Sequence, residues 1–251
     1  MKNISKVIQF PLTINHQIDI TITKKRMKNI RLSISKTGKV SVSIPYHTTY
    51  SYAYQFLVRK RDWIYVQLGK IQQNLAKDSC NFVNNGNVFI LGQSYPLKLE
   101  LSTKNKTIFT NNIDENLQNS QCLSFVIYTK DLSSEYVSNI FIKWCKKYFL
   151  NLFTNRLNYI YSQMFTTPNP PPIKLKLMKS MWGNCNYVKR IITLNLYLAK
   201  TPIECIDYVI VHELAHLIHH NHSKDFHDLL TKIMPDWKTR KKQLNNYSLK
   251  F

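Results

Sequence analysis

The 251-residue chain contains few glycines and cysteines, and it has no long apolar run. No C-x-x-C pair occurs, so a cysteine zinc site or a disulfide framework is not expected, and scattered free thiols indicate a reducing compartment. No apolar run approaches 18 residues, which excludes a transmembrane helix, and residues 1–13 lack the apolar core of a signal peptide. We therefore expect a cytoplasmic protein that binds no membrane. The five cysteines are Cys80, Cys122, Cys145, Cys185 and Cys205.

Acidic residues are also scarce, with 14 Asp and Glu against 35 Lys and Arg and a net charge of +21. The excess lies in the first 200 residues, which hold 28 basic and eight acidic residues, whereas residues 201–251 hold seven and six. The densest basic cluster is Lys24, Lys25, Arg26, Lys28 and Arg31. A basic N-terminal half could bind nucleic acid or another polyanion, or it could simply be a solvated lysine-rich surface. Composition alone does not choose between these two interpretations.

The N-terminal part alternates between strand and helix patterns. Residues 31–44 alternate apolar and polar side chains around a Lys-Thr-Gly-Lys turn, which predicts a β-hairpin. Apolar residues at helical spacing predict one long helix over residues 48–77. Val88 to Leu91 and Tyr95 to Leu101 are typical of strands that flank a turn at Gly92, and the polar residues 103–120 indicate a loop or a variable hairpin.

The C-terminal part begins with a second long helix, expected over residues 133–166. Four prolines in residues 168–172 then forbid helix and indicate a stiff linker. Strands are expected at residues 173–177 and 191–196, separated by the tight Trp182-Gly183-Asn184 segment.

The sequence His-Glu-Leu-Ala-His at residues 212–216 has the H-E-x-x-H pattern of helix-borne zinc hydrolase sites. Histidines four residues apart lie on one helix face, about 6 Å from each other, so His212 and His216 can reach one ion. Glu213 can then take the proton of a water bound to that ion. The alternative is a histidine-rich helix without a metal.

The segment before this motif predicts where its helix begins. Thr201, Pro202 and Glu204 suit a capping box with proline at the first helical position. The helix is apolar on nearly every face, so its histidines and glutamate need a reason to be buried. A metal ion provides that reason.

A catalytic zinc usually has three protein ligands, and several residues beyond His216 could supply the third. His220 continues the same stripe but lies about 12 Å along the axis from His212, too far to share an ion. A turn at Asn221, in a left-handed conformation, would bring in His222, which we favour. Asp225 and Asp228 are the next candidates, whereas His219, His220 and His227 are expected to support the site or lie on the surface.

Four segments of the chain look familiar: residues 178–185, 192–195, 208–216 and 221–223. They resemble the YgjP-like predicted metal-dependent hydrolases, relatives of the WLM and SprT-like metallopeptidases. The resemblance implies that His212, His216 and His222 are the ligands and that Glu213 is the catalytic base. The chain departs from the family at Met181, where arginine is usual, which affects any role of that arginine in orienting substrate or in packing the Trp182 loop.

We therefore expect an α+β protein with two domains. Residues 1–130 would form an antiparallel β-rich domain with a long helix and a basic surface, and residues 131–251 a helical, zincin-like domain of the minimal gluzincin type. The predicted function is a zinc-dependent hydrolase with one ion, most directly a metallopeptidase; the expected substrate is a peptide or protein, or else an anionic molecule. The strand at residues 191–196 could pair with an extended peptide, and Tyr208, Tyr197 or His227 could stabilise the oxyanion.

Two other functions fit the motif. One is a metal-dependent hydrolase of nucleotides or phosphoanhydrides, because the motif fixes the metal and the base but not the bond. The other is a nucleic-acid-binding protein with a structural zinc, in which Glu213 would have no task.

Overall fold

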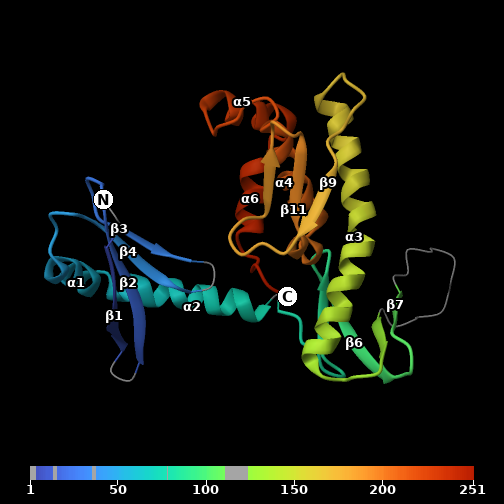
Figure 1. Ribbon diagram of the computed structural model, residues 1–251, viewed down its shortest axis with the longest axis horizontal. Helices are drawn as coiled ribbons and strands as arrows, with labels where there is room; N and C mark the ends of the chain where they lie inside the picture. Colours follow the sequence, from blue (N-terminus) through green and yellow to red (C-terminus); the bar gives the residue numbers. More distant parts are fainter. Residues whose placement is uncertain (1–3, 14–15, 36–37, 78, 111–123) are drawn as a thin grey trace. The chain divides into compact units, whose positions relative to one another are not determined.

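A computed structural model describes residues 4–13, 16–35, 38–77, 79–110 and 124–251, with the backbone alone at residues 73–77 and 110. The chain forms two compact units, Met1–Lys77 (unit 1) and Asp78–Phe251 (unit 2), shown in Figure 1. The domain boundary that we expected near residue 130 falls inside unit 2. The reason is that the strands within residues 87–129 share one hydrophobic core with the helices that follow them.

Unit 1 is a four-stranded sheet with two helices packed on one face. The strands lie in the order β1-β2-β4-β3, and their inward side chains form a core with Ala53, Leu57 and Ile64 of the helices. The predicted hairpin is present, with Leu32 opposite Val42. The elements are β1 (Ile4–Thr13), β2 (His16–Lys25), β3 (Arg31–Ile34), β4 (Val40–Pro45), α1 (Tyr50–Arg59) and α2 (Arg61–Lys77).

The helix that we expected to be continuous over residues 48–77 is interrupted. Lys60 caps α1 with φ −102° and ψ 7°, outside the helical region, and α2 starts at the next residue. The break lets Leu57 and Ile64 both reach the core of the sheet. Apolar spacing alone did not reveal it, because the apolar pattern continues across the break.

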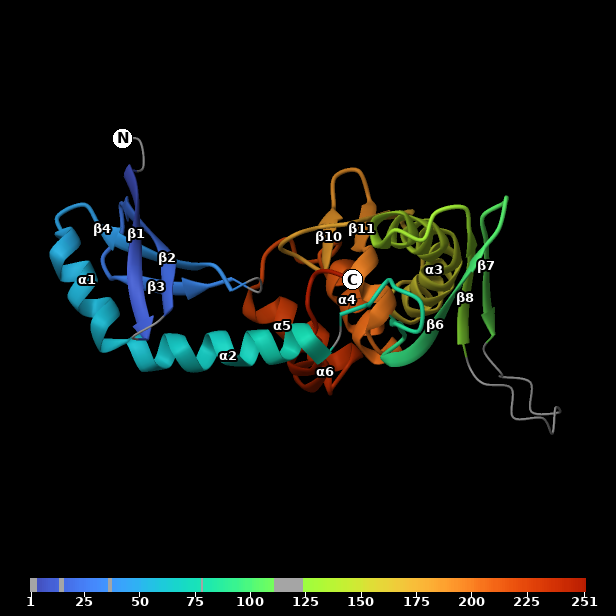
Figure 2. The ribbon, with the colours of Figure 1, turned by 90° about the horizontal axis from the view of Figure 1, so that it is seen from below.

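Unit 2 begins with a second four-stranded sheet, in the order β5-β6-β8-β7, which packs against the long helix α3 (Ser134–Met164). Phe125 of this sheet lies 5.3 Å from Phe141 and 4.7 Å from Trp144 of α3, measured between ring centroids. Figure 2 shows the helix beside the sheet. The strands are β5 (Asn87–Ile90), β6 (Gln93–Leu101), β7 (Lys106–Thr110) and β8 (Ser124–Thr129).

The polar stretch predicted as a loop or variable hairpin is partly a strand. Lys106–Thr110 pairs with β8 in an antiparallel ladder, and residues 111–123, which include Cys122, lie outside the described residues. The β5–β6 turn follows the prediction: Leu91 and Gly92 both have positive φ, 49° and 83°.

The second part of unit 2 carries a three-stranded sheet, in the order β10-β11-β9, with three helices. Strand β10 was not predicted, since we read residues 182–184 as a tight segment. Each of the three sheets contains one parallel pair, β2–β4, β6–β8 and β9–β11. The elements are β9 (Ile173–Lys176), β10 (Gly183–Asn186), β11 (Ile191–Asn195), the 3₁₀ helix η1 (Leu196–Lys200), α4 (Ile203–Ala215), α5 (Lys224–Ile233) and α6 (Trp237–Leu244).

Helix α4 crosses the interior of unit 2 and contacts α3, β10 and β11 (Figure 1). Residues 205–211 are all buried, as the apolar pattern predicted. The Arg156 guanidinium of α3 donates two hydrogen bonds to the Asp207 carboxylate of α4, at 2.8 Å and 2.6 Å. This pair fixes the rotation of α4 against α3 and thereby the direction in which its last turn faces.

The predicted capping box of this helix is absent. Pro202 is the N-cap, and its side chain has no atom that could accept a hydrogen bond. The Thr201 hydroxyl instead donates to the Leu198 carbonyl at 2.9 Å.

Cys145, Cys185 and Cys205 form no disulfide. None of the helices in the described residues combines the length and the apolarity needed to cross a membrane.

Candidate metal centre

Three histidines converge at the end of α4. One ring nitrogen from each of His212, His216 and His222 lies within 4.8 Å of the others, and the Nε2 atoms of His212 and His222 are 3.1 Å apart. Among the described residues, no other group of three or more His, Cys, Asp or Glu side chains comes together in this way. The structure therefore places the three histidines selected from the sequence at one point.

The turn that brings His222 to this point differs from the one we expected. Helix α4 ends at Ala215, with His216 as its C-cap, rather than continuing to Asn221. Among the described residues Asn221 does not have a positive φ, so the left-handed turn predicted there is wrong. The His219 N–H donates to the Ala215 carbonyl at 2.9 Å, and the chain then reverses into α5, whose N-cap is Ser223.

Phe226 of α5 forms an apolar base under the three imidazoles. Its ring centroid lies 5.0 Å from His212, 4.7 Å from His216 and 4.8 Å from His222, and the side chain is fully buried. We did not identify Phe226 as part of the site from the sequence.

The imidazoles of His212 and His216 are held in the form that binds metals. Burial and the neighbouring His216 and His222 lower the pKa of His212 to about 3, and burial also lowers the pKa of His216. A neutral imidazole offers a lone pair, whereas a protonated one offers none. The His216 Nδ1 lies 3.1 Å from the His219 carbonyl oxygen, which orients the ring and leaves Nε2 for an ion.

This arrangement fits a zinc ion. Two nitrogens bound to one tetrahedral zinc at ~2.0–2.1 Å lie about 3.3–3.4 Å apart, close to the 3.1 Å between His212 and His222. The His212 Nδ1 is buried without a hydrogen-bond partner, so the ring's polar contact must come from its other nitrogen. Three protein donors leave a fourth position open, which is typical of catalytic rather than structural zinc sites.

Glu213 lies beside the triad in a tight enclosure. Its side chain is 5% exposed, and its carboxylate accepts a hydrogen bond from the backbone N–H of Cys185 in β10. Burial raises the pKa of Glu213 to about 8, and the Cys185 bond opposes that increase. A Cβ atom at Gly183 would lie 2.5 Å from the Glu213 Oε1, so only glycine lets β10 approach this closely.

Asn195, at the end of β11, fixes the loop that leads into β10. Its fully buried amide nitrogen donates to the carbonyls of Met178 and Met181, both at 2.7 Å. Its amide oxygen accepts from the backbone N–H groups of Met178 and Tyr197, both at 3.2 Å. The Met181 side chain is exposed, so the structure holds this loop through its backbone and not through the residue that replaces the family arginine.

The other candidate residues take different places. Neither Asp225 nor Asp228 joins the group of converging ligand atoms. His220 stacks on Tyr187 at 3.8 Å, and His227 stacks on Trp237 at 5.4 Å, measured between ring centroids. Among the residues considered for the oxyanion, Tyr208 is buried with its ring 5.9 Å from His212, whereas Tyr197 packs against Phe251.

One expectation about substrate pairing is wrong. Strand β11 is the central strand of its sheet, with β10 on one edge and β9 on the other, so it has no free edge for a peptide. The edge strands are β10 and β9, and of these β10 lies against Glu213. In this antiparallel pair the Trp182 carbonyl faces β11 and accepts from Asn195, whereas the Cys185 amide points the other way, to Glu213.

A helix that carries H-E-x-x-H under a small sheet, with a third histidine beyond a turn, is the arrangement of zincin-like metallopeptidases. The model of the YgjP-like metallopeptidase domain matches residues 28–247. The chain therefore belongs to the YgjP-like metallopeptidase family. This family assignment agrees with the resemblance drawn from residues 178–223.

Two solved metallopeptidase zymogens show partial similarity, abylysin of Pyrococcus abyssi and jannalysin of Methanocaldococcus jannaschii. Each is 21% identical; the TM-scores are 0.34 and 0.31. The matches cover 37% and 36% of this chain and 90% and 94% of those chains. Similarity at this level supports no conclusion about function. Among curated proteins, none matches the chain.

Proposed function

We propose that this protein is a zinc-dependent peptidase in which His212, His216 and His222 hold one zinc ion and Glu213 is the general base. The observation that carries the proposal is the convergence of three imidazoles beside the buried side chain of Glu213. Zinc, when bound, polarises the carbonyl of the substrate and makes water more acidic. A purely structural zinc would leave Glu213, a costly buried acid, without a role.

Four residues of the chain have separate roles in the proposed reaction. A carboxylate oxygen of Glu213 takes a proton from the attacking water and later gives it to the leaving amine. The Cys185 N–H holds the carboxylate in place, and Phe226 keeps water away from the lower side of the imidazoles. Tyr208 is the candidate for the oxyanion donor, because burial beside His212 raises its pKa to about 12 and keeps the hydroxyl protonated.

The free edge of β10 is the proposed binding surface for the peptide. A substrate in extended conformation can add to this edge by main-chain hydrogen bonds, as peptides do at exposed sheet edges. Gly183 and Cys185 both approach Glu213, so a peptide on this edge passes beside the base. This arrangement replaces the pairing with residues 191–196 that we expected from the sequence.

Metal content and peptide cleavage test the proposal together. We expect about one zinc per chain after dialysis, lost in His222→Ala and retained in His220→Ala. His220 is a matched control because it lies in the same exposed segment but stacks on Tyr187 instead of joining the triad. Glu213→Gln should keep the zinc and lose peptide cleavage by at least about 100-fold.

Phosphate release from nucleotides should be measured with the same variants. Cleavage of labelled peptides that depends on Glu213 supports a peptidase. Glu213-dependent phosphate or pyrophosphate release without peptide cleavage would replace this proposal by a phosphoanhydride hydrolase. Full zinc occupancy in His222→Ala would overturn the ligand set.

A further inference from the structure

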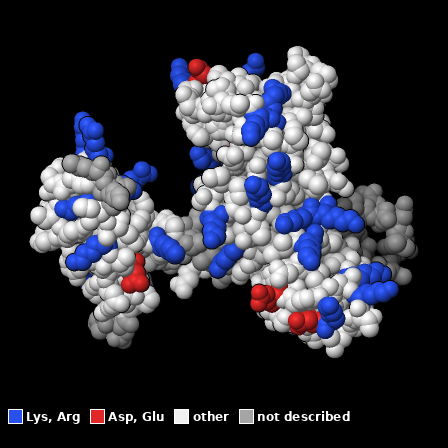
Figure 3. All heavy atoms as spheres, in the orientation of Figure 1, with Lys and Arg blue, Asp and Glu red and all other residues white. Residues whose placement is uncertain are grey.

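Unit 1 carries a large positive charge that has no role in the proposed peptidase reaction. Its 77 residues hold 14 Lys and Arg and two Asp and Glu, and residues 20–61 hold ten Lys and Arg and no acidic residue. Among the described residues of unit 1, no Lys or Arg forms an ion pair with a carboxylate. Figure 3 shows Lys and Arg side chains on the visible face of both units, with few acidic ones. The positive charge is therefore available to an anionic partner.

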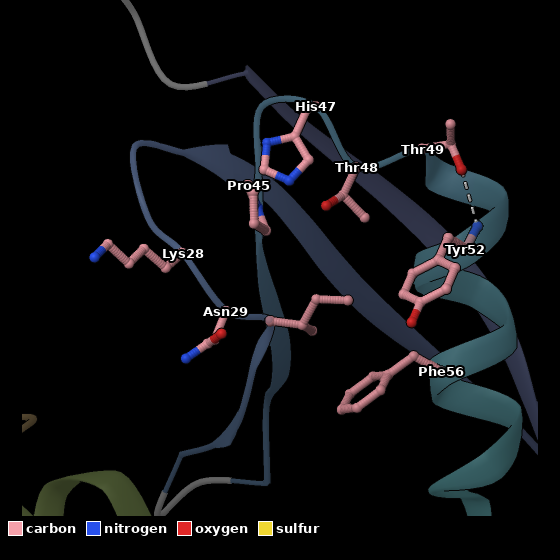
Figure 4. Close-up of a pocket in the computed structure, with 9 residues that line it drawn as sticks. Lys28, Asn29, Pro45, His47, Thr48, Thr49, Tyr52 and Phe56 are labelled. Atoms are coloured by element: carbon pink, nitrogen blue, oxygen red, sulfur yellow. Dashed lines mark hydrogen bonds between the residues drawn. The ribbon is translucent and has the colours of Figure 1, made fainter.

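The same 20–61 segment encloses a hollow of about 660 Å³. Tyr52 and Phe56 reach into it from α1, and Lys28 and Asn29 line the opposite side, as Figure 4 shows. Ile30 and His47 also line the hollow. This volume falls within the range of ~300–1,000 Å³ found for small-molecule sites and gives the hollow one apolar wall and one polar, basic side.

Two aromatic rings at the start of α1 have cations close to them, and one of these rings, Tyr52, lines the hollow. Tyr52 is 51% exposed, and the Arg59 guanidinium carbon lies 5.9 Å from its ring centroid. At the neighbouring Tyr50, the Lys24 Nζ lies 5.0 Å from the ring centroid. Tyr50 is half-buried, whereas the exposed Tyr52 ring beside a cation suits a single-stranded nucleic acid, because a base can stack on the ring while phosphates bind the charges.

We propose that unit 1 binds single-stranded nucleic acid, with an unstacked base against Tyr52 and Phe56 in the hollow and the phosphates on Lys28 and the neighbouring basic residues. A duplex cannot insert a base into a recess without unpairing it, so single strands are preferred. An acidic peptide would use the charges but has no base to stack in the hollow. The proposal is independent of the peptidase reaction, since none of these residues belongs to the zinc site.

The test is fluorescence anisotropy of the full chain with a labelled 15-nucleotide oligo(dT), between 50 and 200 mM NaCl. Tyr52→Ala should weaken binding by about fivefold or more, because stacking of one base contributes ~1–3 kcal/mol. Lys28→Ala should make the slope of log affinity against log salt shallower by about 0.7, the value for one phosphate contact on a single strand.

Two matched controls lie in unit 2. Tyr159 is also exposed, at 59%, and also has a guanidinium, that of Arg156, 5.5 Å from its ring centroid. Tyr159→Ala and Lys146→Ala should leave the affinity and the salt slope as in the wild type.

Three results would overturn the proposal: no binding at 50 mM NaCl, equal weakening by Tyr52→Ala and Tyr159→Ala, or heparin or phosphatidylserine vesicles bound as tightly as the oligonucleotide and unaffected by Tyr52→Ala. The last result would identify a general polyanion surface instead. Binding of the corresponding duplex more weakly than the single strand supports the proposal.

Discussion

Replacing Gly183 by alanine should displace the side chain of Glu213, the proposed general base, without contacting His212, His216 or His222. The added Cβ would lie 2.5 Å from Glu213 Oε1, 2.8 Å from Cγ and 2.9 Å from Cδ. Ordinary contact begins at 3.4 Å, so the carboxylate must move by about 0.9 Å, the difference between 3.4 and 2.5 Å. Glu213 is 5% exposed and bonded to the Cys185 amide, so it cannot rotate away freely.

A displacement of about 1 Å at a reacting group costs on the order of 100-fold in rate, which is the expected loss of peptide cleavage in Gly183→Ala. Overpacking should also cost about 1–3 kcal/mol of unfolding free energy. Zinc content should stay near one per chain. The assay compares kcat/KM on a fluorogenic peptide, zinc content and urea unfolding for the variant and the wild type.

Gly69→Ala is the matched control. Gly69 lies within α2, and a Cβ there would meet nothing within 4 Å, so helix propensity predicts up to about 1 kcal/mol of stabilisation and unchanged cleavage. Wild-type activity in a folded Gly183→Ala would refute the reasoning, because it would mean that Glu213 does not need its present position. Loss of zinc in the variant would refute it in another way, by showing that the disturbance reaches the histidines.

Three further results are expected. Asn195→Ala should lower the unfolding free energy by about 2–4 kcal/mol in urea titrations, because it leaves buried carbonyl and amide groups of the residue 178–181 loop unpaired. A change below about 0.5 kcal/mol would show that other contacts hold the loop. Arg156→Met should lower the unfolding free energy by about 2–3 kcal/mol. The loss is smaller than the ~3–5 kcal/mol of a fully buried pair because the Arg156 side chain is 35% exposed. Adding Asp207→Leu should restore most of this free energy, and failure to do so would contradict the ion-pair account. EDTA should lower the melting temperature of the wild type and leave that of His222→Ala unchanged. The reason is that a ligand at a free concentration of about 1,000 times its Kd stabilises the folded state by ~4 kcal/mol. An equal shift in both proteins would place the metal elsewhere.

Much of the fold follows from local patterns. The alternation in residues 31–44 and the broad apolar face of residues 133–166 predicted β3–β4 and α3 closely, because each element buries a face that its own sequence marks. Strand β10 was missed because four residues with glycine and two asparagines carry no apolar alternation. The break at Lys60 was missed because both helices present apolar residues to the same core.

The residues of the site were also predicted from the sequence only in part. His212, Glu213 and His216 are visible in the sequence because the helix itself sets their spacing, and His222 follows because three ligands on one straight stripe cannot reach one ion. The reason given for its approach was only partly right. The helix ends at Ala215, and the reversal uses ordinary turns instead of a left-handed Asn221.

Sequence by itself selected the residues that we propose to carry the chemistry, because that chemistry depends on residue type and on short spacings along one helix. Tertiary structure alone decided what surrounds them: the fit of Gly183 against Glu213, the Cys185 amide on its carboxylate, the Asn195 clamp and the Phe226 base. It also decided that the free edge beside the base belongs to β10 and not to β11. These contacts join residues far apart in the chain, and only the packing of the whole unit fixes distances of that kind.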